Sequence, residues 1–194
     1  MRRSMAPAIL AILAILVVMA VFPACADTSY AGLQQRPIKA LSAQQIDDLR
    51  AGRGMGMALA AELNDYPGPR HVLDLSDKLG LGLPPAQRKR VSRLFDEMAG
   101  RARALGGQIL AAERRLDRLF AQKRAGDAEL RSITAVIARR NGDLRYVHLG
   151  YHLSVRGLLS DRQIARYATL RGSEDQSDKK SPEPGRHRGH GRHK

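Results

Sequence analysis

Two long stretches of the chain place apolar or small residues three and four positions apart, the spacing of one face of an α-helix. In the first stretch, from Met98 onward, the steps alternate four and three, the heptad pattern of a helix packed along a partner. A turn at Gly126-Asp127 separates the two stretches, so the pattern predicts an antiparallel hairpin of long helices. The seam positions are Val91, Leu94, Met98, Ala102, Leu105, Ile109, Ala112, Leu116 and Leu119, then Leu130, Ile133, Ile137, Asn141, Leu144, His148, Tyr151, Val155 and Leu158.

Residues with known end preferences mark the limits of these two helices. Pro84 and Pro85 begin the first one, because proline fits the first turn of a helix. The glycine pair Gly106-Gly107 predicts a bend within it. Asp127 is the expected N-cap of the second helix, and Gly157 marks its end.

Shorter helices are expected on both sides of the hairpin. The first follows Ser42 and is expected to run to Leu63, although each glycine within it weakens the helix by roughly 1 kcal/mol relative to alanine. The second covers Val72 to Leu79 and ends at Gly80 as C-cap, and the last follows Ser160 as N-cap. The predicted fold class is therefore all-α, an antiparallel long-helix hairpin with shorter flanking helices.

The beginning of the chain has the pattern of an export signal. Arg2 and Arg3 precede the uncharged apolar run 8–22, and Ala24-Cys25-Ala26 carries small residues at the positions that signal peptidase reads. A retained membrane anchor is one alternative, and a lipoprotein acylated at Cys25 is another. The expected segments are a signal peptide at 1–26, a flexible lead-in at 27–40, a helical domain at 41–172 and a disordered basic tail at 173–194.

The composition favours packing of helices and indicates which kinds of partner the protein would bind. Hydrophobic residues make up 43% of the chain but aromatic residues only 4%, which favours helices over a β-sandwich. The net charge of +14 favours anionic partners, whereas export argues against nucleic acid. A single cysteine forbids an intramolecular disulfide. The sequence has no phosphate-binding glycine loop, HExxH or serine elbow, so we expect no enzymatic activity.

A pattern of the type Leu-[Ser/Thr]-x-x-Gln occurs at Leu159, Ser160 and Gln163 and again at Leu41 to Gln45, with a variant at Leu83 and Gln87. Physically it is an apolar residue followed by a capping box, in which serine and glutamine each bond the other's backbone amide. In a basic, cysteine-poor, helical chain with an export signal, these motifs resemble the Spy/CpxP group of periplasmic LTxxQ proteins.

The resemblance covers roughly Leu73 to Gly172, with Pro84 in place of the capping hydroxyl and the Ser42 segment as an addition. It implies a cradle-shaped helical protein, often a homodimer. It also implies ATP-independent chaperone activity, inhibition of a stress response, or metal sensing. The sequence does not choose among these activities.

Histidines supply the candidate metal ligands, for which Zn, Ni or Cu is the expected ion and none is required. His148 and His152 are four residues apart on one predicted helix, a spacing that lets two imidazoles share a metal. The alternative for His148 is a hydrogen-bonded core histidine. In the tail, His187, His190 and His193 form an H-x-x-H-x-x-H arrangement that binds metals loosely or, alternatively, belongs to a cationic segment touching anionic lipids.

Basic residues crowd the first long helix and supply the candidate client-binding surface. Arg114, Arg115 and Arg118 alternate there with Leu116 and Leu119, which suits loose binding of unfolded chains by charge and apolar contact. A solvated helix face is the alternative. The leading hypothesis is a periplasmic chaperone-like protein for misfolded envelope polypeptides. The rivals are a metal-binding sensor or resistance protein and an envelope structural protein whose tail rests on an anionic membrane surface.

Overall fold

The computed structural model describes residues 30 and 32–180, and only the backbone at 78–79 and 172–180. In these residues all regular structure is helical, which confirms the predicted all-α class. The chain divides into two units after Gln35, and each α-helix that the structure describes belongs to the second unit, from Arg36 onward. None of the described helices is long and apolar enough to cross a membrane. The elements are η1 (Leu33–Gln35), α2 (Ala43–Ala51), α3 (Leu59–Glu62), α4 (Pro69–Leu79), α5 (Pro85–Ala121), α6 (Asp127–Arg156) and α7 (Asp161–Lys180).

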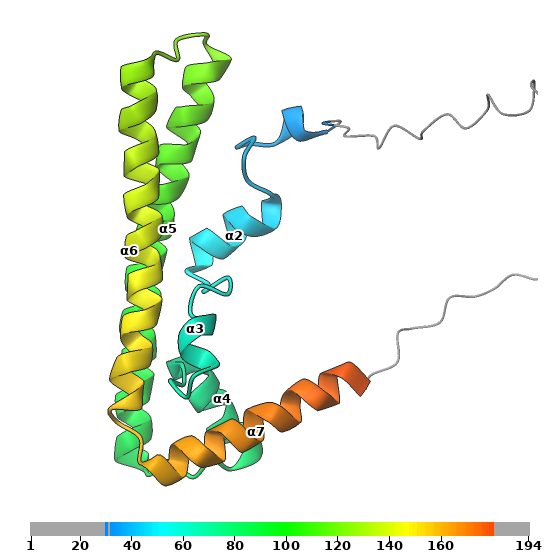
Figure 1. Ribbon diagram of the computed structural model, residues 1–194, viewed down its shortest axis with the longest axis vertical. Helices are drawn as coiled ribbons and strands as arrows, with labels where there is room; N and C mark the ends of the chain where they lie inside the picture. Colours follow the sequence, from blue (N-terminus) through cyan, green and yellow to red (C-terminus); the bar gives the residue numbers. More distant parts are fainter. Residues whose placement is uncertain (1–29, 31, 181–194) are drawn as a thin grey trace, which may run out of the picture. The chain divides into compact units, whose positions relative to one another are not determined.

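The two longest helices, α5 and α6, are joined by a short turn and pack along each other in opposite directions (Figure 1). Their contacting faces carry the predicted seam, with Met98 of α5 against Val147 and Tyr151 of α6. Pro85 occupies the first turn of α5, as the sequence predicts. Helix α6 begins one residue differently from the prediction. Gly126 is its N-cap, and Asp127 is its first residue, with its carboxylate bonded to Arg131 at 2.8 Å.

The segment after Ser42 differs most from the prediction. The Ser42–Gln45 capping box forms, but α2 ends at Ala51 and does not continue to Leu63. Gly52 adopts the left-handed conformation (φ +67°), and a β-carbon there would lie 2.8 Å from the backbone nitrogen of Arg103. Glycine therefore permits both the turn and the close approach to α5, and a separate short helix, α3, follows the loop.

Helix α2 crosses α5 at Gly106. A β-carbon at this position would stand 1.9 Å from the carbonyl oxygen of Leu49, so only glycine allows the two backbones to meet. Gly107 has open space beside it. The glycine pair thus lies inside one continuous helix, where Gly106 provides a packing site for α2. Ile46 and Leu49 of α2 are buried in this contact with α5.

The two motif glutamines meet where α5 begins and α7 begins. Gln87 and Gln163 exchange hydrogen bonds of 3.0 and 2.8 Å between their side-chain amides, and Gln87 also donates to the carbonyl oxygen of Leu158 at 2.6 Å. Ser160 caps α7 as predicted, accepting from the backbone N–H of Gln163 at 3.3 Å. Leu159 is buried in the cluster that joins α4, α5, α6 and α7, and Leu83 packs against it.

Helix α7 is longer than predicted. The sequence predicts a disordered tail from Ser173, whereas the helix continues to Lys180. Residues 173–180 contain neither glycine nor proline and place acidic residues before two lysines, an order that suits the helix dipole. The signal peptide at 1–26, Cys25, and the tail histidines His187, His190 and His193 lie outside the described residues.

Candidate functional site

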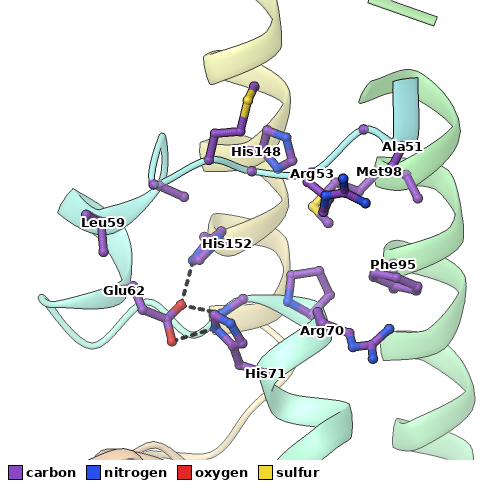
Figure 2. A pocket seen from close by; sticks show the side chains of 18 of the residues that line it. Ala51, Arg53, Leu59, Glu62, Arg70, His71, Phe95, Met98, His148 and His152 are labelled. Atoms are coloured by element: carbon purple, nitrogen blue, oxygen red, sulfur yellow. Dashed lines mark hydrogen bonds and ion pairs between the residues drawn. The ribbon is translucent and has the colours of Figure 1, made fainter. Parts of the chain in front are cut away.

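A cavity of about 640 Å³ lies between α5, α6, the loop after α2 and the start of α4. Figure 2 shows His148 of α6 on the side of Met98 and Phe95 of α5, whereas His152 of α6 points toward Glu62 of α3. The wall contains apolar side chains, small residues and six basic or imidazole groups. Its charged and imidazole lining residues are Arg53, Glu62, Arg70, His71, Asp96, Arg103, His148 and His152.

Gly54 and Gly68 lie against the two histidines, Gly54 in ordinary contact and Gly68 too close for a side chain. A β-carbon on Gly54 would lie 3.5 Å from Nδ1 of His148, and one on Gly68 would lie 2.8 Å from Cε1 of His152. Gly68 stands between Pro67 and Pro69, and all three residues are buried. Replacing Gly68 would push the His152 ring out of place, so this glycine is required by the site itself.

Glu62 is the charged centre of the lower part of the site, and only 5% of its side chain is exposed. His71 Nδ1 lies 3.0 Å and Arg171 Nε 3.5 Å from its Oε1, and the Tyr167 hydroxyl donates to the same oxygen. Its Oε2 accepts from the backbone N–H of Gly68 at 3.1 Å and lies 3.5 Å from Nδ1 of His152. The carboxylate therefore ties α3 to α4, α6 and α7.

These partners decide the ionisation of Glu62. Burial alone would raise the pKa of this carboxyl, but the hydrogen bond from His71 and the charges of His71, His152 and Arg171 lower it below its ordinary value. Glu62 is consequently ionised at neutral pH despite being buried. The nearby Nδ1 of His152 also lies 2.6 Å from the carbonyl oxygen of Tyr66, to which it donates, and this fixes the orientation of the ring.

His148 differs from Glu62 in both its hydrogen bonding and its charge. It is 4% exposed, and its Nε2 is buried without a hydrogen-bond partner in the part of the chain that the structure describes. Burial, together with the neighbouring His152, lowers the pKa of His148 below its ordinary value, so the ring is neutral at pH 7. A buried polar atom without a partner costs free energy, about 1–3 kcal/mol. The ring would gain from a ligand that supplied the missing bond.

The structure brings His148 and His152 to one cavity wall, as their spacing predicts, and adds Glu62 and His71, which the sequence analysis did not single out. Within residues 30 and 32–180, no group of three or more His, Cys, Asp or Glu side chains is arranged to hold a metal ion. In the sequence, Glu62 is only an acidic residue near the expected end of the helix that follows Ser42. Its partners lie 6 to 109 positions further along the chain, and no local pattern links them.

The predicted client-binding residues lie elsewhere, near the far end of α5. Arg115 and Arg118 are exposed and Arg114 is half-buried, whereas Leu116 and Leu119 are half-buried. The next residue, Phe120, is 57% exposed. The arginines therefore face solvent beside one accessible aromatic ring, and the two leucines turn partly toward α6.

Comparisons with known proteins return nothing: no family model, no curated protein and no solved structure matches this chain. The functional argument therefore rests on the residues and their geometry.

Proposed function

We propose that the protein is an ATP-independent, chaperone-like binder of misfolded polypeptides in the bacterial periplasm, similar to the Spy/CpxP group. The proposal includes export by the signal at 1–26, a cradle-like arrangement of the helices, and a homodimer that doubles the binding surface. It also includes the expectation that the protein is not an enzyme. Residues 83–87 and 159–163 carry the resemblance, and their glutamines pair at the joint between α5 and α7.

One observation carries the proposal: large apolar side chains are exposed on helices rich in arginine. Tyr146 and Leu153, seven residues apart on α6, are 70% and 62% exposed, and Arg145 is exposed beside Tyr146. Phe120 extends the same combination to the end of α5. Exposed apolar groups among charges can hold an unfolded chain weakly and release it without nucleotide hydrolysis.

The test measures aggregation of a denatured acidic client with and without the mature protein, in the absence of nucleotide. Reversing Arg114, Arg115 and Arg118 to Glu should abolish most of the suppression. High salt should weaken the wild type in the same way, because exposed charges are screened beyond roughly 10 Å at 0.1 M salt.

The matched control reverses Lys89, Arg90 and Arg93 to Glu. These residues are exposed near the start of the same helix and give the same change in net charge. This variant should keep substantially more activity than the first. If both variants suppress aggregation as well as the wild type does, at low and at high salt, the basic surface does not take part in client binding.

Metal binding is the second candidate, because His148 and His152 lie four residues apart on α6 and line one cavity. The discriminating experiment titrates Zn²⁺, Ni²⁺ and Cu²⁺ into the mature chain. Two variants separate the predicted sites, one with His148 and His152 replaced by Ala and one with His187, His190 and His193 replaced by Ser. Loss of binding in one variant alone assigns the site, and no binding by the wild type ends this hypothesis.

A further inference from the structure

The loop at residues 52–54 gathers three nitrogen-bearing side chains at one end of the cavity. Gly52 lies against Arg103, whose Cγ would be 3.1 Å from a β-carbon at that glycine. Gly54 lies against the Nδ1–Cε1 edge of His148. Arg53 stands between these glycines, and Figure 2 shows its side chain between His148 and Met98. Arg53, Arg103 and His148, from the loop, α5 and α6, therefore belong to one stretch of the cavity wall.

These three groups are incompletely paired. Arg53 bonds Asp48 at 2.5 Å through Nε, which leaves its two terminal nitrogens. Arg103 forms no hydrogen bond or ion pair within residues 30 and 32–180, and it is exposed. The Nε2 of His148 is buried and unpartnered. The terminal nitrogens of Arg53 and the guanidinium group of Arg103 therefore offer hydrogen-bond donors to an anionic group.

The remainder of the cavity is suited to an aliphatic body. Leu59, Phe95 and Met98 line it together with alanines and glycines. Met98 is an adaptable side chain that fits irregular apolar ligands. The carboxylate of Glu62, at the lower wall, already has its own partners. Pockets of roughly 300–1,000 Å³ with an apolar wall and a few convergent polar groups are typical small-molecule sites.

We propose that this cavity binds a small amphipathic carboxylate, an aliphatic acyl chain with its head group at Arg53 and Arg103 and its chain along Phe95 and Met98. This site is separate from the client surface of α5 and does not depend on the chaperone proposal. The carboxylate matches the donors in charge, and the chain replaces cavity solvent with apolar contact.

The experiment is isothermal titration calorimetry of the mature chain with decanoate below its micelle concentration. Decylammonium has the same chain with the opposite charge, and acetate has the head group without the chain. We expect one decanoate per chain, with affinity at least tenfold higher than for either control. N-acetyl-leucine tests whether an amino-acid carboxylate binds equally well, which would contradict the acyl assignment.

Two variants locate the site on the protein. Ala99→Leu fills the cavity wall and Arg103→Gln removes one cation, and each should weaken decanoate binding at least tenfold. Their matched controls, Ala111→Leu and Arg93→Gln, change exposed positions of the same helix and should bind as the wild type does. The His148 ring proton resonances should shift on addition of decanoate to the wild type.

Four results would overturn the proposal. They are absence of decanoate binding, equal binding of decylammonium, equal binding of N-acetyl-leucine, and binding that survives both Ala99→Leu and Arg103→Gln. Thermal unfolding followed by circular dichroism verifies that each variant is folded. If Ala99→Leu does not fold, Arg103→Gln decides the outcome, because Arg103 is exposed and its replacement leaves the core intact.

Discussion

The side chain of Gln163 both caps the start of α7 and connects α7 to α5. Its Oε1 accepts from the backbone N–H of Ser160 at 3.0 Å, closing the capping box of α7. The same amide exchanges two hydrogen bonds with Gln87 at the start of α5. The sequence predicts the first role, because a capping box is local. It does not predict the second, because the partner lies 76 positions away.

Replacing Ser160 with Ala should lower the free energy of unfolding by about 1 kcal/mol. The substitution removes the hydroxyl that accepts from Gln163 N–H and leaves the Gln87 contact in place. Urea unfolding followed by circular dichroism measures the change. Ser42→Ala, at the other complete capping box, should have a similar effect. An unchanged midpoint in urea for Ser160→Ala would show that its cap does not contribute.

At the scale of elements, the periodicity of the sequence predicts where α4, α5 and α6 lie, because each has an apolar face and end signals within a few residues. The periodicity does not predict the loop between α2 and α3. Three glycines within five positions look like weak points of one helix, yet Gly52 and Gly54 are placed by close approach to Arg103 and His148. Such close approaches depend on α5 and α6, so a local pattern cannot reveal them.

Replacement by alanine should have opposite effects on stability at the neighbouring positions Gly106 and Gly107. Gly107→Ala should stabilise the protein by up to about 1 kcal/mol, because alanine favours a helix interior and nothing obstructs its methyl group. Gly106→Ala should destabilise it by roughly 1–3 kcal/mol or more, since the methyl group would overlap the Leu49 carbonyl oxygen. Thermal melts of the two variants make the comparison. Equal shifts would show that α2 does not pack on Gly106.

Across the whole second unit, the Glu62 carboxylate connects four helices. His71 on α4, His152 on α6, and Tyr167 and Arg171 on α7 all face it. None of these contacts could be inferred from the sequence, in which Glu62 is one acid among many. The wall histidines His148 and His152 could be singled out from their spacing, but the carboxylate beside His152 could not.

Stability should therefore fall in acid through Glu62. Its pKa is lowered in the folded protein, so the stabilisation is fully present above the unfolded pKa, near 4.5, and is lost as pH falls through the folded value. Between pH 7 and pH 3, the wild type should lose more unfolding free energy than Glu62→Gln, as measured by urea unfolding. Asp127→Asn, at an exposed surface pair, is the control and should follow the wild type. An equal loss of unfolding free energy between pH 7 and pH 3 in the wild type and in Glu62→Gln would contradict this role.

The position of Glu62 along the chain also affects the order in which the protein can fold during synthesis. The chain emerges with its N-terminal end first, and Glu62 appears long before Tyr167 and Arg171, which follow 105 and 109 residues later. Until α7 arrives, the carboxylate lacks two of its partners. The loop and helices around it cannot close without burying a poorly compensated charge. The set of Glu62 partners is thus completed only when α7 has been synthesised, so a chain interrupted before α7 would remain open to proteolysis around Glu62.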